Sequence, residues 1–192
     1  MFKTLVIASS VAVFGVAAVI AEARPPMDHT REQMAVEREA VEMVAQVEEV
    51  ARDVVYHAER LADLTKAPGV SRWAHYHHLD DIKALVNNGL RPALKGLTDV
   101  QAQLPEWKQE SVDRMVADAT RLSEDASSAY IAKASGTGLP LAMNDAYKRF
   151  ISGVVANAAA LVKTSDAAHS YAEAHLKASE AGLSVPKARP TS

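Results

Sequence analysis

Hydrophobic positions recur every three or four residues along four long stretches of this chain, and the longest of these stretches is residues 144–181. Alternating steps of three and four place side chains along one face of an α-helix. This face is narrow and alanine-rich, and it extends for about ten turns. A stripe of this length can be buried only against other long helices, so it predicts a bundle. Its members are Tyr147, Phe150 or Ile151, Val154, Ala158, Leu161, Ser165, Ala168, Ala172 and His175 or Leu176.

The same spacing occurs in three earlier stretches, each of which is predicted to form one helix. Residues 30–66 carry Met34, Val41, Val44, Val47, Ala51, Val54, Ala58 and Leu61. Residues 71–104 carry His75, His78 or Leu79, Ile82, Leu85 or Val86, Leu90, Ala93, Leu97, Val100 and Leu104. Residues 105–135 carry Val112, Met115 or Val116, Ala119, Leu122, Ala126, and Ala129 or Tyr130.

Local signals mark the ends of these helices and one interruption. Proline and glycine in the stretch 67–70 predict a turn, and Asn144 is suited to cap the last helix. Residues 87–89 (Asn-Asn-Gly) and Pro92 interrupt the second stripe, although its hydrophobic register continues across them. Proline removes one backbone hydrogen bond and crowds the preceding turn. This combination predicts a single helix that is kinked near Pro92.

The connections between the predicted helices are short, which favours antiparallel neighbours. We therefore expect an all-α fold in which residues 24–182 form an antiparallel up-down-up-down four-helix bundle with long helices. Residues 183–192 are expected to form a flexible tail. Gly153 lies inside the last helix, where glycine costs about 1 kcal/mol relative to alanine. Its presence predicts the close approach of a neighbouring helix or of a ligand.

The first 23 residues have the three parts of a secretory signal peptide. A basic start at Lys3 precedes an apolar run over residues 5–20 and an Ala-Glu-Ala cleavage site at 21–23. We expect cleavage after Ala23, export to the periplasm or exterior of a bacterium, and no stable membrane anchor afterwards. An uncleaved anchor is the alternative. The chain contains no cysteine, which excludes disulfides and covalent attachment of c-type haem.

The net charge of −3 gives no reason to expect nucleic-acid binding. Acidic residues nevertheless dominate the outer face that is predicted for the first helix. This face is interpreted as solvated or, alternatively, as a docking surface for a basic partner. Its acidic members are Glu32, Glu37, Glu39, Glu42, Glu48, Glu49 and Asp53, against Arg31, Arg38 and Arg52. An unidentified protein partner, or self-association, is the expected kind of interaction.

Histidines supply the first candidate chemistry. His57 borders the stripe of the first helix, and counting back from the turn places it level with His78 on the second. His75 lies on the same face as His78. Imidazoles on facing helices, joined by the carboxylate of Asp81, predict a pocket for zinc, copper or iron. Further carboxylate candidates are Asp53, Glu124 and Asp125. The alternative is a polar and aromatic lid, since Trp73, Tyr76 and His77 belong to the same run.

A methionine near the start of the first helix and a histidine near the end of the last form a second candidate pair. Met34 and His175 both lie on predicted core stripes at similar heights. This arrangement resembles the haem ligation of the periplasmic cytochrome b562 family. The resemblance, limited to two residues and the architecture, implies Met34 and His175 as axial haem ligands. The alternative is a core methionine and a helix-end histidine.

No nucleophile, base and orienting group can be placed together from the sequence. We therefore expect a non-enzymatic interaction or binding module. The alternative is a metal- or haem-binding four-helix bundle that uses the histidines above.

Overall fold

The computed structural model describes residues 31–67, 69–134 and 140–180, and every regular element within these ranges is helical. The predicted signal peptide (1–23) and tail (183–192) lie outside the described residues. Within the described ranges, no helix combines the length and the apolar character that crossing a membrane requires. The elements are α1 (Arg31–Leu64), α2 (Arg72–Leu85), the π-helix η1 (Val86–Leu90), α3 (Arg91–Val100), the 3-10 helix η2 (Gln101–Gln103), α4 (Glu106–Ala134), the 3-10 helix η3 (Leu141–Met143) and α5 (Asp145–Glu180).

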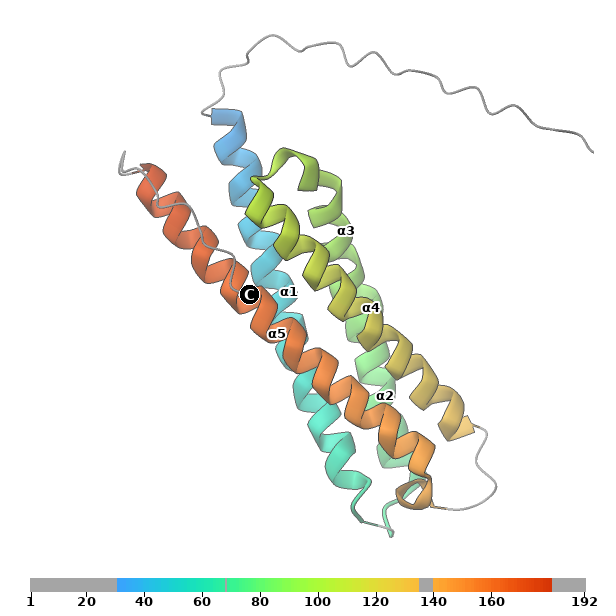
Figure 1. The fold of residues 1–192 in the computed structure, drawn as a ribbon. Coiled ribbons are helices and arrows are strands. Elements are labelled where there is room, and N and C mark those ends of the chain that lie inside the picture. The colour runs from blue at the N-terminus through green and yellow to red at the C-terminus, as the bar shows by residue number, and fades with distance from the viewer. Residues whose placement is uncertain (1–30, 68, 135–139, 181–192) are drawn as a thin grey trace, which may run out of the picture.

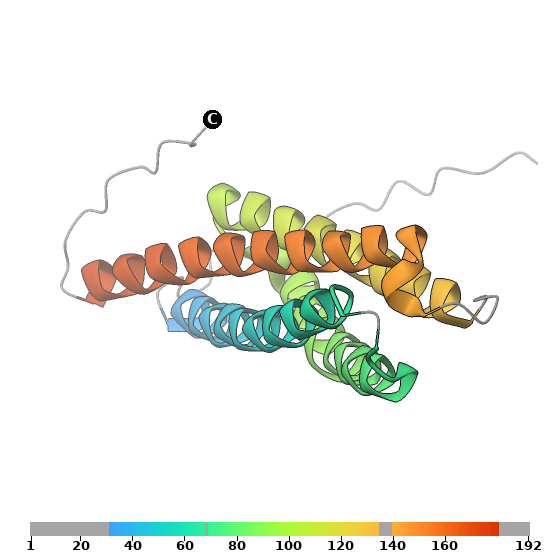
Figure 2. The ribbon, with the colours of Figure 1, turned by 90° about the horizontal axis from the view of Figure 1, so that it is seen from below.

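These elements form four long helical segments that run up and down the molecule, because η1 joins α2 and α3 into one continuous segment (Figure 1). Helix α5 packs along α1 on one side and along α4 on the other. The view from below shows α5 lying across its neighbours, while α1 is also covered by α2 and α3 (Figure 2). The predicted antiparallel four-helix bundle is therefore confirmed.

The alanine-rich stripe of α5 is buried along nearly its whole length, as its spacing predicts. With 36 residues, α5 is about 54 Å long. Its first turn is capped as expected, because the Asn144 side-chain oxygen accepts a hydrogen bond of 3.0 Å from the backbone amide of Tyr147. The buried stripe members are Tyr147, Ile151, Val154, Ala158, Leu161, Ser165, Ala168 and Ala172.

Charged residues occupy positions in two of the core stripes. On α1, Glu37 lies three residues before the buried Ala40 and is itself only 7% exposed. Its carboxylate accepts a hydrogen bond of 2.7 Å from the ammonium group of Lys108 on α4, which is 5% exposed. The prediction that Glu37 belongs to the solvated outer face is therefore wrong. The helix period places this residue on the core side, and Lys108 provides the charge that makes its burial tolerable.

The interruption of the second predicted helix is a π-helix. In η1 the backbone amide of Arg91 donates to the carbonyl of Val86, five residues earlier. Buried residues in this segment advance by two consecutive steps of four, from Ile82 to Val86 and from Val86 to Leu90. A wide π turn absorbs the extra residue and keeps the same face toward the core. The chain therefore stays helical across the region just before Pro92.

Glycines in two helices permit close packing. A Cβ atom on Gly89 would lie 2.8 Å from a methyl carbon of Val50 on α1, a separation that real contacts do not show. On α5, a Cβ atom on Gly153 would collide with the carboxylate of Asp125 on α4. The space beside Gly153 is therefore filled by a side chain of the neighbouring helix, which agrees with the first of the two expectations for this glycine.

Replacing Gly89 by alanine is expected to destabilise the fold. The new methyl group must displace Val50, and overpacking of this kind costs about 1–3 kcal/mol. The gain in helix propensity, about 1 kcal/mol, offsets part of that cost. Urea unfolding of the parent, Gly89→Ala, Val50→Ala and the double variant measures both effects. The Gly89→Ala change should become neutral or stabilising when Val50 is already alanine; an equal cost in both backgrounds would contradict the close contact.

Candidate metal centre

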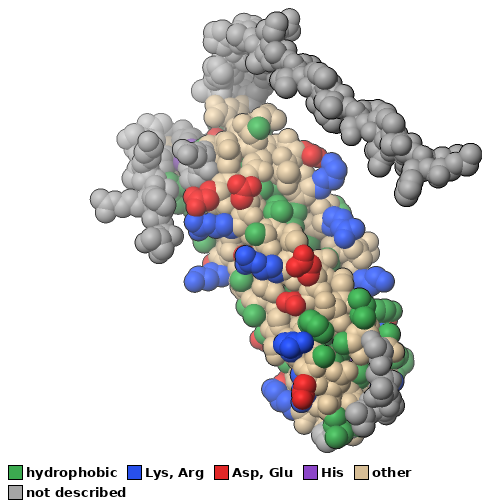
Figure 3. Space-filling view, turned by 45° about the vertical axis from the view of Figure 1, so that its right-hand side comes forward, with side chains coloured by type: hydrophobic (Ala, Val, Ile, Leu, Met, Phe, Trp, Pro, Cys, Tyr) green, Lys and Arg blue, Asp and Glu red, His purple; other side chains and the backbone are tan. Residues whose placement is uncertain are grey.

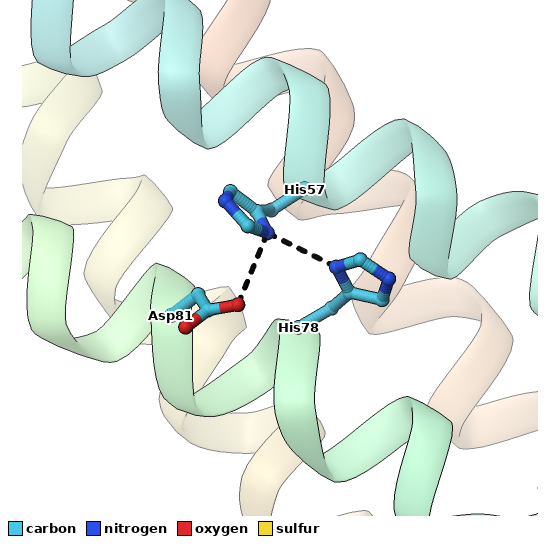
Figure 4. A group of neighbouring side chains, drawn as sticks. All are labelled: His57, His78 and Asp81. Carbon is cyan, nitrogen blue, oxygen red and sulfur yellow. Dashed lines mark hydrogen bonds and ion pairs between the residues drawn. The ribbon is translucent and has the colours of Figure 1, made fainter.

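Three potential metal ligands converge where α1 passes α2 (Figure 4). His57 lies on α1, and His78 and Asp81 lie on α2. The Nδ1 atoms of His57 and His78 are 3.0 Å apart. The His57 Nδ1 atom is 3.4 Å from the Asp81 Oδ2 atom. One ligand atom from each residue lies within 4.8 Å of the other two. We call His57, His78 and Asp81 the His-His-Asp site.

Helix periodicity and a short turn bring these side chains together. His78 and Asp81 are three residues apart, so they project from the same side of α2. Helix α1 ends at Leu64 and α2 begins at Arg72, so the two helices are antiparallel neighbours. Residues at similar distances from the turn then face each other. The structure places His57 beside His78, as counting back from the turn predicts, and it places Asp81 with them.

The two imidazoles of the site share one proton, and the surroundings of His78 favour its neutral form. At a separation of 3.0 Å, one of the two Nδ1 atoms must carry a proton and donate it to the other. Burial lowers the pKa of His78, and the neighbouring His57 and His77 lower that pKa further, while the Asp81 carboxylate partly opposes the shift. His78 therefore favours the neutral form, which is the form that ligates metals.

The distances suit direct coordination. With metal–nitrogen bonds of about 2.0–2.1 Å, neighbouring ligand atoms lie about 3.0 Å apart in octahedral and about 3.4 Å apart in tetrahedral coordination. The separations of 3.0 Å and 3.4 Å from His57 Nδ1 fall in this range. The third separation, between His78 and Asp81, lies within 4.8 Å.

Aromatic side chains surround the site, which stays open to solvent. The side chains of His57 and Asp81 are 22% and 33% exposed. The rings of Tyr56 and His57 meet in a T-shaped arrangement, with ring centroids 5.2 Å apart. His77 stacks on Trp73 with centroids 5.8 Å apart, and its Nδ1 atom is 3.5 Å from the Asp81 Oδ2 atom. Trp73 and His77, from the sequence run that suggested a lid, therefore lie beside the His-His-Asp site, whereas Tyr76 contacts Lys133 on α4.

His75, the third histidine of the predicted pocket, is placed elsewhere. Its side chain is 1% exposed, and its Nδ1 atom lies 3.1 Å from the hydroxyl oxygen of Tyr147 on α5. Burial lowers the pKa of His75, and the nearby His78 adds to this shift. Burial also raises the pKa of Tyr147 above its usual range. The neutral His75 and Tyr147 form a polar link between α2 and α5.

The further carboxylate candidates also lie apart from the site. Asp53 and Glu124 are exposed. The Asp125 carboxylate accepts a hydrogen bond of 2.8 Å from the Asn157 side-chain amide on α5. Asp81 is thus the carboxylate that the structure groups with His57 and His78.

The two residues suggested as haem ligands lie near the other end of the bundle. Met34 is half-buried. The Nδ1 atom of His175 is 3.6 Å from the Glu37 Oε2 atom, the same oxygen that accepts from Lys108. His175 therefore belongs to a buried polar cluster that joins α1, α4 and α5. The haem hypothesis remains a prediction.

The buried lysines Lys108 and Lys133 were not identified from the sequence, although their positions in the helix period indicate that they face the core. Lys108 lies four residues before Val112, and Lys133 lies four residues after Ala129, so both continue the stripe of α4. Their register marks them as core-facing. Neither position reveals which residue on another helix it meets.

Acid is expected to destabilise the metal-free protein through His75. Its lowered pKa means that the unfolded state takes up a proton below about pH 6.5, whereas the folded state resists protonation. Stability should therefore fall as the pH drops below 6.5, by at most about 1.4 kcal/mol per pH unit. The double variant His75→Leu/Tyr147→Phe removes both polar groups and should weaken this dependence. Urea unfolding in EDTA between pH 7.5 and 5 measures the dependence of the unfolding free energy on pH, with Tyr147→Phe as control. If the double variant shows the same pH dependence as the parent, His75 is not its cause.

Removing the buried ammonium of Lys108 should be costly. The Lys108→Met variant leaves the Glu37 carboxylate buried without its ammonium partner, which is expected to cost about 3–5 kcal/mol. The double variant Glu37→Leu/Lys108→Met removes both charges and should recover most of the lost stability. Lys66→Met provides the control, because Lys66 pairs with Asp63 at the exposed surface. Thermal and urea unfolding measure the effects; equal losses in the Lys66 and Lys108 variants would contradict burial of the pair.

Comparisons with protein-family models, with curated proteins and with solved structures return no match. The functional interpretation of the His-His-Asp site therefore depends on its own geometry and chemistry.

Proposed function

We propose that this protein is an exported, non-enzymatic carrier of a divalent transition metal ion, held by His57, His78 and Asp81. The observation that carries the proposal is the convergence of two imidazole nitrogens and one carboxylate oxygen within 4.8 Å. Two imidazoles and a carboxylate are ligands that zinc, copper and iron accept in proteins. Magnesium and calcium prefer sites built from oxygen ligands alone.

The number of ligands and the solvent exposure of the site favour an ion that is exchanged over an ion that supports the fold. Structural zinc sites normally have four protein ligands, whereas three leave a coordination position open. The partial exposure of His57 and Asp81 gives an incoming ligand access to that position. Most buried side chains of the bundle core are apolar and are not ligands of the site, so folding has a source of stability that is independent of metal. An open position on a stable scaffold suits uptake and release.

Zinc is the appropriate first test ion because it has no geometric preference of its own from d-electrons. Untagged protein, stripped with EDTA, is expected to bind one Zn²⁺ per chain in isothermal titration calorimetry. Binding at 100 times the dissociation constant should stabilise the fold by about 2.7 kcal/mol. Loss of a residue that only hydrogen-bonds to a metal ligand costs about 10–100-fold in metal affinity. His57 and His78 are proposed as direct ligands, so His57→Ala or His78→Ala should weaken zinc binding by at least about 100-fold. Protonation of the imidazoles should also weaken binding in acid.

His169→Ala is the matched control. His169 is another half-buried histidine, and its Nδ1 atom pairs with Glu48 at 3.0 Å between α5 and α1, away from the site. This variant should bind zinc as the parent does. Equal binding by the parent and the His57 and His78 variants would refute the proposal. Indifference of the parent to zinc and to chelator would instead favour the interaction module, and a Soret band in untreated protein would favour the haem hypothesis.

A further inference from the structure

A second concave region lies between α2–α3 and α4, on a part of the molecule that the metal proposal does not use. Helices α2 and α3 touch α4 at only a few places, in contrast to the long contacts that α5 makes with α1 and α4. The cavity left between them has a volume of about 370 Å³. Volumes of about 300–1,000 Å³ are typical of sites for small organic ligands. We call this cavity the α2–α4 groove.

Two cations line the groove from the same helical segment. Lys83 on α2 and Arg91 on α3 both border it. Within the described parts of the chain, neither side chain forms an ion pair with a carboxylate. Lys95, by contrast, is also on α3 but outside the groove, and it pairs with Asp99 at 2.6 Å. Eight residues separate Lys83 from Arg91, or about 12 Å along the segment. An anion in the groove can therefore meet a positive charge at either end.

A third cation strengthens the positive potential at one end. The Lys133 ammonium is 3.6 Å from the ring centroid of Tyr76 and 3.9 Å from that of Tyr130, which lines the groove. Lys83 lies over the same Tyr130 ring at 5.2 Å. Lys133 is only 6% exposed. Burial lowers its pKa; Asp80 acts in the opposite direction, and Lys83 lowers the pKa further. The two lysines repel each other, so a bound anion would stabilise both.

The remaining walls offer apolar area together with hydroxyl groups. Val86 on η1 and Ile131 on α4 both line the groove, as do Ser123 and Ser127 on α4. On the face shown in Figure 3, hydrophobic side chains gather toward the lower end, where Lys and Arg side chains are also present. The π-helix η1 contributes Val86 to the wall, and π-helical turns occur frequently at functional sites.

We propose that the α2–α4 groove binds a small organic carboxylate with a flat apolar body. The body would lie between Val86, Ile131 and the Tyr130 ring, while the carboxylate would accept hydrogen bonds from Lys83 or Arg91. Charge complementarity selects an anion, and the volume and apolar walls select an organic molecule over an inorganic ion. This site is independent of the His-His-Asp site.

The test titrates 2-naphthoate into isotopically labelled protein and follows the backbone amides by two-dimensional NMR. The parent is expected to bind with a dissociation constant on the order of 1 mM or below, since ligands of this size contribute limited free energy per atom. Shifts should concentrate in residues 83–91 and 123–131. The neutral analogue 2-naphthamide should bind more weakly. Lys83→Gln and Arg91→Gln should each reduce naphthoate affinity about five- to tenfold, with little effect on the amide.

Two further variants complete the design. Lys95→Gln removes an exposed lysine of the same segment outside the groove and should leave binding unchanged. Ser127→Phe keeps every charge but fills the groove, and it should abolish binding of both compounds. The proposal is overturned if naphthoate does not bind at about 10 mM, or if naphthamide binds equally well. It is also overturned if the Lys95 variant loses as much affinity as the Lys83 variant. Binding should persist in EDTA.

Discussion

Burial of the long stripe on α5 is the constraint on which the architecture depends. The stripe is too long to be covered by loops, so it requires two helices of similar length, and α1 and α4 flank it. Small members such as Ala158 and Ala168, and Gly153 beside them, allow these neighbours to approach closely. Such close packing contributes many weak contacts that together are large. Helices α2 and α3 then complete the bundle mainly by packing against α1.

Polar groups inside the core connect particular pairs of helices. Glu37 and Lys108 join α1 to α4, and His75 and Tyr147 join α2 to α5. Each partner satisfies the other in surroundings where an unpaired charge or hydrogen-bonding group would be costly. These links make alternative registers less favourable, because a shift of any helix would leave a buried polar group without its partner.

The segment formed by α2, η1 and α3 carries both proposed sites. Its side toward α1 presents His78 and Asp81, whereas its side toward α4 presents Lys83 and Arg91. Both sites lie on this segment because its side chains are less completely covered by neighbouring helices. Side chains at the edge of a helix interface keep access to solvent, while the helix holds their backbone in place. The π-helical turn adds a local widening without breaking the core stripe. A rigid helix with accessible side chains is a suitable support for binding sites.

The sequence by itself determined which stretches are helices, most of the buried face of each, where α5 begins and that His57 and His78 share a height. These properties depend on the periodicity of one helix and on the length of the turns, both of which are local. Only the tertiary structure decided that Asp81 joins the two histidines while His75 turns to Tyr147, and that Glu37 is buried against Lys108. It also decided that α2 and α3 contact α4 at only a few places and that a groove lies between them. The helix period indicates on which face of its helix a residue lies. Which residue it contacts on another helix depends on the rotation and separation of the two helices, and the packing of the whole core sets both.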